Sequence, residues 1–263
     1  MSTASTAPPP LHSAFGLQGR IALVTGSTHG IGAATARVLA QAGAHVLVSS
    51  RKPDECEQVA AALRAEGLSA EGFACHLGLM EDIAAVSAHL AERHGGLDIL
   101  VNNAVLSPWR SIDALEPALF TKTVEVNLRG YWYLSVEATR LMKPRGGGSI
   151  VNISSISAWH PEKMLGLYGT LKTALIGMSR AFALEYGEFG IRANTILPGV
   201  IDTRLAQAFD EEAQARILHK TPVQRLGRPE EIGYAALYLS SAAGAFVNGA
   251  SLAVDGGISI SML

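Results

Sequence analysis

Short apolar runs alternate with longer amphipathic segments along most of the chain. An uninterrupted apolar run is typical of a parallel strand that is buried on both faces, and apolar residues at helical spacing are typical of a helix that covers a sheet. On this basis we expect strands at 21–25, 45–49, 70–75, 98–101, 149–154, 192–197 and 251–254. We expect the intervening helices at 33–42, 55–65, 81–93, 114–142, 168–186, 202–220 and 229–240.

The regular alternation of strand and helix predicts the fold class. Strands that are connected by helices of this length form a parallel sheet with right-handed crossovers. The fold class is therefore α/β, a single-domain doubly wound (Rossmann) parallel sheet with helices on both faces. We assign residues 17–263 to this domain, whose size and apolar content suffice for one large core. Residues 1–16, rich in Ser, Thr, Ala and Pro, are expected to form a mobile N-terminal tail.

The composition argues against several classes of function. The formal net charge is −2, and the sequence has no Lys/Arg block of the kind that binds nucleic acid or anionic lipid. No uninterrupted apolar stretch reaches transmembrane length. Two cysteines, Cys56 and Cys75, provide neither a disulfide framework nor a metal-binding spacing, which fits a reducing compartment. We therefore expect a cytoplasmic protein with a small-molecule substrate and no metal, membrane or nucleic-acid partner.

A glycine-rich turn directly follows the first predicted strand. Gly26, Gly30 and Gly32 form the pattern G-x-x-x-G-x-G at the start of the next helix. Glycines let the backbone approach a pyrophosphate closely, and a helix N-terminus offers free N–H groups to it. A strand, a glycine turn and a helix in this order predict a dinucleotide-binding site, although the pattern by itself also suits a plain turn.

The end of the second predicted strand indicates which dinucleotide is bound. An NAD enzyme places an acidic residue about 20 residues beyond the glycines, where it bonds the ribose hydroxyls. Here the strand ends in Ser49 and Ser50, which are followed by Arg51 and Lys52. A 2′-phosphate would meet two cations and a hydroxyl at this point, which favours NADP(H). The same residues also suit a solvated turn in which Asp54 caps the next helix.

Tyr168 and Lys172 open the predicted helix 168–186. Side chains four residues apart share one face of a helix, so a cation lies beside a phenol. A phenol must shift its pKa by about three units to act near neutrality, and an ammonium about 4 Å away supplies roughly that energy. Ser155 ends the fifth predicted strand, and Asn127 lies in an apolar helical stripe, where an amide needs partners. Taken alone, Tyr168 and Lys172 also suit an exposed helix face, and Asn127 also suits an amide of the core.

Together these signals resemble the classical short-chain dehydrogenases/reductases. The resemblance covers residues 19–257, and the motifs occur in the family's order. Ser155 precedes Tyr168 by thirteen residues, which is the family's usual interval. The motifs are Thr25-Gly26-x-x-x-Gly30-x-Gly32, Asn102-Asn103-Ala104, Asn127, Ser155, Tyr168-x-x-x-Lys172 and Pro198-Gly199.

The resemblance implies an enzyme that moves hydride between a nicotinamide cofactor and a carbonyl carbon. Tyr168 would exchange a proton with the substrate oxygen, and Ser155 would hydrogen-bond that oxygen. Lys172 would lower the pKa of Tyr168 and hold the nicotinamide ribose, and Asn127 would bind a water molecule in the proton relay. The expected cofactor contacts, with Ile201 and Thr203 at the carboxamide, are Gly26, Ser27, Thr28, Gly30, Ile31, Gly32, Ser50, Arg51, Lys52, Leu77, Asn102, Ala104, Tyr168, Lys172, Ile201 and Thr203.

Two positions depart from the family's pattern. Val105 stands where glycine usually follows Asn-Asn-Ala, and His76 replaces an aspartate that contacts adenine. Segments 49–52, 75–78 and 146–149 look most like the NADPH-dependent retinal and carbonyl reductases of the peroxisomal type. Members of that group end in a tripeptide related to Ser-Lys-Leu, whereas this chain ends in Ser-Met-Leu, so we favour the cytoplasm over the peroxisome. The resemblance also implies a homotetramer, paired through the helices of Asn127 and Tyr168.

The expected activity is the NADPH-dependent reduction of a ketone or aldehyde to an alcohol, which is reversible. The loops near Ser155 and Tyr168 carry mostly large apolar residues, which favours bulky apolar carbonyls. We expect the substrate pocket to be lined by Val105, Trp109, Trp159, Leu165 and Leu205. Two alternatives remain. A 3-oxoacyl reductase of fatty-acid type would need a basic surface near the site, and a non-catalytic nucleotide-sensing regulator would be expected to lack Tyr168 or Lys172.

Overall fold

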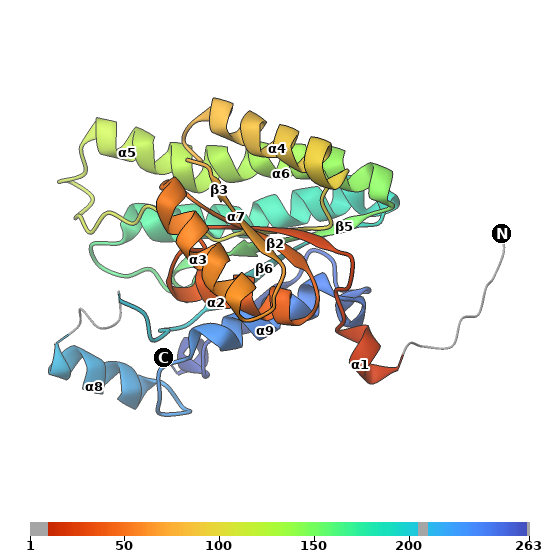
Figure 1. Cartoon of the computed structure of the whole chain (residues 1–263). Coiled ribbons are helices and arrows are strands. Elements are labelled where there is room, and N and C mark those ends of the chain that lie inside the picture. Colours follow the sequence, from red (N-terminus) through yellow and green to blue (C-terminus); the bar gives the residue numbers. More distant parts are fainter. Residues whose placement is uncertain (1–9, 205–209, 262–263) are drawn as a thin grey trace.

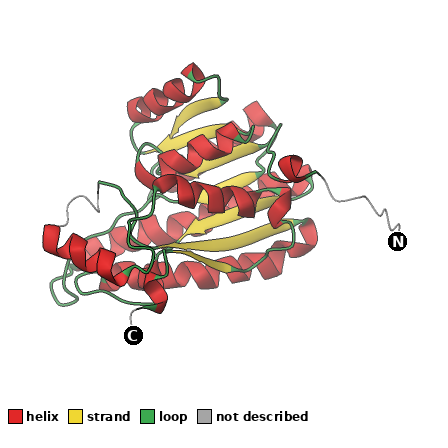
Figure 2. Cartoon of the chain, turned by 90° about the horizontal axis from the view of Figure 1, so that it is seen from below, coloured by secondary structure: helices red, strands yellow, loops and turns green. Residues whose placement is uncertain are grey.

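The computed structural model of the chain describes residues 10–204 and 210–261. Its strands are β1 (Ile21–Thr25), β2 (His45–Ser50), β3 (Ala70–Ala74), β4 (Ile99–Asn102), β5 (Gly148–Ile153), β6 (Ile191–Pro198) and β7 (Ser251–Val254). Its α-helices are α1 (Leu11–Ala14), α2 (Gly30–Gln41), α3 (Pro53–Ala65), α4 (Met80–His94), α5 (Pro117–Val124), α6 (Gly130–Met142), α7 (Gly166–Tyr186), α8 (Glu211–Lys220) and α9 (Pro229–Ser240). The sheet lies in the middle, with helices on both sides (Figures 1 and 2).

The described strands form one parallel sheet in the order β3-β2-β1-β4-β5-β6-β7. The chain winds outward in one direction from β1 and in the other from β4, so the sheet is doubly wound. The predicted fold class is confirmed. Ligands of such sheets bind beyond the carboxyl ends of the strands, at the point where the winding reverses. Here that point lies between β1 and β4, whose carboxyl ends lead into the glycine turn and the Asn-Asn-Ala motif.

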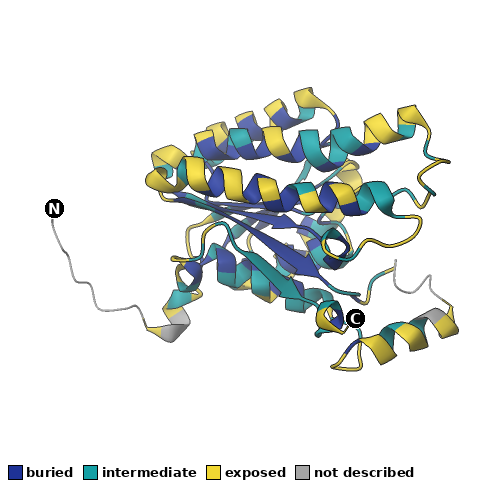
Figure 3. Cartoon of the chain, turned by 180° about the vertical axis from the view of Figure 1, so that it is seen from behind, coloured by how far each residue is buried: buried dark blue, intermediate teal, exposed yellow. Residues whose placement is uncertain are grey.

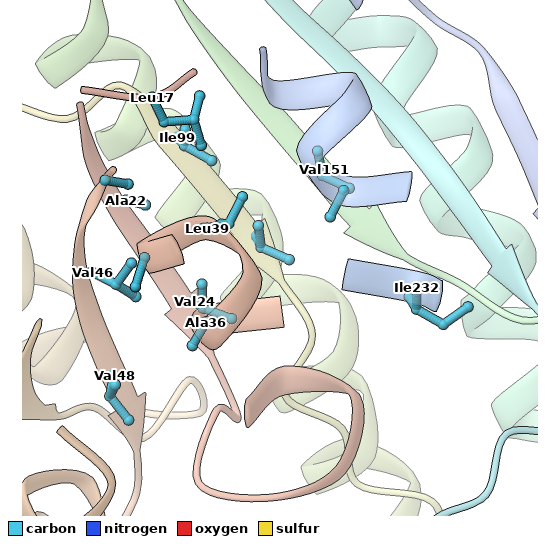
Figure 4. Packing of buried hydrophobic residues seen from close by; sticks show 14 of the residues in the cluster. Leu17, Ala22, Val24, Ala36, Leu39, Val46, Val48, Ile99, Val151 and Ile232 are labelled. Atoms are coloured by element: carbon cyan, nitrogen blue, oxygen red, sulfur yellow. The ribbon is translucent and has the colours of Figure 1, made fainter. Parts of the chain in front are cut away.

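Alternate residues of each strand pack against opposite layers of helices. Ala22 and Val24 of β1 belong to a core that includes residues of α2, α3 and α9, part of which Figure 4 shows. Leu23, between them, belongs to a second core with residues of α4, α6 and α7. The strands are therefore apolar on both faces, as the sequence predicts for a buried parallel sheet. In Figure 3 the strands are largely buried, while the outer faces of the helices are exposed.

Three segments differ from the sequence-based expectation. Residues 11–14, within the predicted tail, form one turn of helix, α1. The predicted helix 114–142 begins later, at Pro117, and a π-helical turn at Glu125–Arg129 separates α5 from α6. Within the predicted helix 202–220, the helix that the structure describes is α8, which begins at Glu211. Ile201, just before that range, makes an isolated parallel bridge to Gly227. The later start of α5 fits proline's preference for the first helical turn.

The described helices include none that is both long enough and apolar enough to cross a bilayer. Several large side chains nevertheless lie on the outer surface of α6 and α7, among them Trp132, Tyr133 and Leu184. These are the helices that the family resemblance assigns to subunit contacts, and the homotetramer stays a prediction.

Candidate active site

The turn between β1 and α2 packs tightly against the segment that follows β4. Gly26 has φ +63°, and a Cβ at this position would lie 2.6 Å from Cα of Ala104. A Cβ on Gly32 would overlap the carbonyl oxygen of Gly26 and lie 2.5 Å from Nδ2 of Asn103. Only glycine allows this approach of two backbones. The turn therefore presents bare backbone at the start of α2, which fits the phosphates of a dinucleotide.

Asn103 fastens this turn. Its Nδ2 donates hydrogen bonds to the carbonyl oxygens of Thr25 and Gly26, each at 3.0 Å. Its backbone N–H donates to Oγ1 of Thr25 at 2.9 Å. Asn102, which we expected at the cofactor, is instead fully buried and donates to two side chains of the core. Neighbouring residues of a strand point to opposite faces, so the second residue of the motif reaches the turn and the first does not.

A cavity of about 960 Å³ opens in front of the glycine turn, at the carboxyl edge of the sheet. Its position at the reversal of winding and its bare-backbone rim fit a dinucleotide cofactor. The predicted cofactor contacts that line it are Gly26, Gly30, Ile31, Ser50, Arg51, Leu77, Ala104, Tyr168, Lys172 and Thr203. Those that do not line it are Ser27, Thr28, Gly32, Lys52, Asn102 and Ile201.

Ser27 and Gly32 support the turn from behind. The Ser27 hydroxyl donates to the carbonyl oxygen of Val24 at 2.6 Å and accepts from the backbone N–H of Ser49 at 2.9 Å. It thereby ties the turn to the end of β2. Thr28, in front of the helix, hydrogen-bonds Nδ1 of His29, which itself lines the cavity.

The segment after β2 gives the cavity one cation rather than the two that we expected. Ser50 and the exposed Arg51 line the cavity. The Lys52 ammonium is 2.7 Å from Oε1 of Glu55, because the two side chains share one side of the first turn of α3. Of the two cations expected in this segment, only Arg51 is therefore placed to meet a phosphate in the cavity.

His76, the second departure from the family's pattern, lines the same cavity. Its Nδ1 accepts a hydrogen bond from the backbone N–H of Gly78 at 3.0 Å. An acceptor Nδ1 leaves the proton on Nε2 in the neutral ring. A ring donor thus replaces the carboxylate acceptor that the family usually has here.

Helix α7 brings Tyr168 and Lys172 to the cavity. Lys172 is buried, and its Nζ donates to the carbonyl oxygen of Ile153 at 2.6 Å. The same nitrogen lies 5.6 Å from the centroid of the Tyr168 ring. Ser155 begins a short 3-10 turn after β5, with its Oγ accepting from the backbone N–H of Ser157 at 3.1 Å, and it also hydrogen-bonds the Tyr168 hydroxyl. Three of the four predicted catalytic side chains therefore converge.

Burial controls the protonation of this pair. It raises the pKa of Tyr168, and the hydrogen bond with Ser155 opposes the rise. It lowers the pKa of Lys172 to about 7. We expected Lys172 to lower the pKa of the phenol, but the pKa moves upward because burial of Tyr168 outweighs the opposing hydrogen bond. A raised pKa keeps the phenol protonated at neutral pH, which is the state that a proton donor needs.

Asn127, the fourth predicted catalytic residue, lies in the π-helical turn between α5 and α6. Its Oδ1 accepts from the backbone N–H of Leu106 at 2.9 Å, and its Nδ2 donates to the carbonyl oxygen of the same residue at 2.7 Å. The amide therefore fixes the segment that lines the cavity after β4. This favours the core-amide interpretation of the side chain. Single π-helical turns are frequent at functional sites, and the expected water-binding role stays a prediction.

The predicted substrate residues are only partly assembled. Val105 lines the cavity. Trp109 and Trp159 lie outside its lining, with 48% and 45% of their surfaces exposed, and Leu165 also lies outside it. Leu205 falls outside the described residues.

Two loops near the entrance are nevertheless joined. The backbone N–H of Arg110 donates to the carbonyl oxygen of Met164 at 2.9 Å. Met164 has φ +68°, a strained value for a residue with a side chain.

Lys122 of α5 also lines the cavity. No motif marks it in the sequence, because only the packing of α5 brings it there.

Comparison with known proteins agrees with this geometry. A family model described as enoyl-(acyl carrier protein) reductase matches residues 26–259. A rabbit (Oryctolagus cuniculus) protein named dehydrogenase/reductase SDR family member 4 is 40% identical over 245 residues, which cover 92% of this chain and 94% of the relative. The chain belongs to the short-chain dehydrogenase/reductase family. The family expected from the sequence is thus confirmed, and with it an oxidoreductase that acts on CH–OH groups.

Two solved structures of this family superpose closely on the chain. A gluconate 5-dehydrogenase from Burkholderia cenocepacia, in complex with NADP and tartrate, has a TM-score of 0.91 at 34% identity and covers 95% of this chain and 99% of its own. A 7α-hydroxysteroid dehydrogenase complexed with NADH and 7-oxo glycochenodeoxycholic acid has a TM-score of 0.91 at 32% identity, with 95% and 98% covered. One of these enzymes holds a polar acid and the other a large steroid acid, so the fold leaves the substrate open.

Proposed function

We propose that the protein is a carbonyl reductase that reduces bulky apolar ketones or aldehydes with NADPH and runs in reverse as an alcohol dehydrogenase. The use of NAD(P) is that of the family. The observation that carries the proposal is that a buried lysine and a protonated phenol, which a serine hydroxyl hydrogen-bonds, line a cavity with a bare glycine rim.

Bound NADPH would supply the hydride, and the residues of the chain would hold it at the glycine turn, Thr203 and Lys172. The Tyr168 phenol donates its proton to the carbonyl oxygen of the substrate as negative charge develops there. The Ser155 hydroxyl donates a hydrogen bond to the same oxygen, which stabilises that charge. Lys172 supplies a proton that replaces the one that Tyr168 has donated, because a pKa of about 7 lets the lysine carry or release a proton near neutrality.

Two observations support the finer parts of the proposal. Arg51 supplies positive charge where an NAD enzyme has an acid, so we favour NADPH over NADH. Val105 and Leu106 give the cavity an apolar wall beside the phenol, so we favour an apolar substituent on the carbonyl.

A panel of carbonyl compounds with both cofactors tests the proposal. We expect kcat/KM with NADPH to rise at least about tenfold from acetone to a phenyl ketone, equal to roughly 1.4 kcal/mol of added apolar contact. Val105→Ala should remove part of that gain, because Val105 lines the cavity, whereas Trp159, which lies outside the lining, should matter less. Faster turnover of charged oxo-acids would overturn the substrate class, and faster turnover of an acetoacetyl thioester would favour the 3-oxoacyl alternative. Binding of NADPH without turnover of any compound would favour the nucleotide-sensing alternative.

A further inference from the structure

Four side chains converge at the amino edge of the sheet, at the opposite end of the strands from the cavity. His45 is the first residue of β2, Glu71 lies in β3, and His89 and His94 lie in the last turns of α4. Oε1 of Glu71 is 2.6 Å from Nε2 of His94, 2.9 Å from Nε2 of His89 and 3.8 Å from Nε2 of His45. Three imidazoles thus point the same nitrogen at a single carboxylate oxygen.

Hydrogen bonding alone does not satisfy this cluster. One carboxylate oxygen offers two lone pairs, and His89 and His94 occupy the two short contacts. Nε2 of His45 is buried and has no hydrogen-bond partner. A buried polar atom without a partner costs about 1–3 kcal/mol. A partner from outside the chain, placed between the three ligand atoms, would satisfy this nitrogen.

We propose that His45, Glu71 and His94 form a binding site for a divalent transition metal ion of the zinc type, while His89 holds the Glu71 carboxylate from the side. Imidazole nitrogens with one carboxylate suit Zn²⁺, whereas Mg²⁺ and Ca²⁺ prefer sites made of oxygen. Tetrahedral ligands about 2.0–2.1 Å from Zn²⁺ lie about 3.4 Å from one another. The separations of 2.6–3.8 Å around Oε1 bracket this value. Among the described residues, no other three His, Cys, Asp or Glu side chains converge this closely.

The surroundings orient the ligands as a metal site requires. Nδ1 of His45 is 2.7 Å from Oγ of Ser69, which holds the ring with Nε2 facing the cluster. Such an outer contact fixes the tautomer of a ligating histidine. Nε of Arg93 lies 3.7 Å from Oε2 of Glu71, on the oxygen that faces away from the histidines. The ligand side chains are 12–25% exposed, so an ion can reach them from solvent.

The position of the site indicates its role. His45 and Ser50 are the two ends of β2, about 16 Å apart at the rise of a strand. The ion would therefore lie far from the reacting groups and would link the edge strand β3 to β2 and to α4. We expect it to stabilise the fold and to leave the chemistry unchanged.

Zinc binding to the tag-free full-length protein, treated with a chelator and then dialysed, tests the proposal. Titration with ZnCl₂ in a calorimeter should give one ion per chain. A hundredfold excess over Kd should raise Tm by roughly 5 °C, while MgCl₂ should not. His94→Ala should weaken zinc binding at least about a hundredfold and leave NADPH binding unchanged. His219→Ala, which removes an exposed histidine of α8, is the matched control and should bind zinc like the unmodified chain.

A second variant covers the case in which His94→Ala does not fold. Ser69→Ala keeps all three ligands and removes only the contact that orients His45, so zinc binding should weaken about tenfold. The proposal is overturned if the unmodified chain fails to bind zinc tighter than about 100 µM, roughly 5.5 kcal/mol. Equal zinc affinity of the unmodified chain and of either ligand-cluster variant would overturn it as well.

Discussion

The two edges of the sheet carry polar side chains that are organised in different ways. At the carboxyl edge, backbone and side chains from β1, β4, β5 and α7 surround a large cavity, and glycines keep it open. At the amino edge, imidazoles from β2 and α4 close on one carboxylate of β3. The first arrangement suits an organic molecule with phosphates, and the second suits a single ion. The same parallel sheet thus offers two sites, and the side chains and backbone groups that its loops and helix ends place at each edge set the chemistry of each site.

The largest expected effect comes from filling the space behind the glycine turn. Gly32→Ala would force a Cβ against the carbonyl oxygen of Gly26, so NADPH affinity should fall more than about a thousandfold, or 4 kcal/mol. Gly177→Ala is the matched control, since a Cβ there has no neighbour within 4 Å. Fluorescence titration with NADPH measures both. Zinc binding at the amino edge should survive in both variants, and its loss in Gly32→Ala would show that the two edges are not independent.

The next effect is on stability and depends on pH. The folded pKa of Lys172 is about 7, below the ordinary value of 10.5, so between these values the unfolded chain binds the proton and the folded chain does not. Stability should therefore rise with pH across this window, and below pH 7 the full penalty of burial remains. Lys172→Met should raise the free energy of unfolding by about 3 kcal/mol at low pH, after allowance for relaxation around the charge, and by much less near the upper end of the window.

Urea unfolding of both proteins at several pH values measures this difference. A methionine variant that is no more stable than the unmodified chain below pH 7 would mean that the buried ammonium carries no penalty. Removal of His94 or of Glu71 should not reproduce the pattern, because those groups belong to the other edge.

A smaller effect is expected at the 2′-phosphate end of the cavity. Arg51→Asp should weaken NADPH between about tenfold and a hundredfold, or 1.4–3 kcal/mol, because a charge-assisted hydrogen bond becomes a repulsion. NADH should bind nearly unchanged. Lys52→Asp is the matched control: Lys52 already pairs with Glu55 outside the cavity lining, so its loss should matter less. Equal kcat/KM for NADPH and NADH in the unmodified protein would contradict the assigned cofactor preference.

The carboxyl-edge site could be predicted from the sequence because its residues follow strand ends in short motifs. The three glycines of the turn lie within one short segment, and Tyr168 and Lys172 are four residues apart, so local geometry fixes the relation inside each motif. The motif does not show that the Asn102 side chain points into the core while Asn103 holds the glycine turn, because this depends on which face of the strand each residue takes. The direction of the Tyr168 pKa shift could not be read from spacing, because it depends on how deeply the phenol is buried.

The amino-edge cluster had no such signature. His45, Glu71 and the two histidines of α4 come from three elements, and only the register between β2 and β3 and the packing of α4 bring them together. The expectation of no metal rested on cysteine spacing, which says nothing about dispersed histidines. The substrate loops were hard to predict for a similar reason: large apolar residues at 109 and 159 do not reveal whether they face the cavity or solvent.

The most direct test of the central claim is the rate of hydride transfer in a single turnover, with saturating NADPH and a phenyl ketone, for the unmodified chain and for Tyr168→Phe. We expect the rate to fall by about a hundredfold to ten-thousandfold, while the Kd of NADPH, measured on the same samples, changes less than about twofold. That split would identify the phenol as the proton donor. A phenylalanine variant that transfers hydride at the unmodified rate would contradict the account.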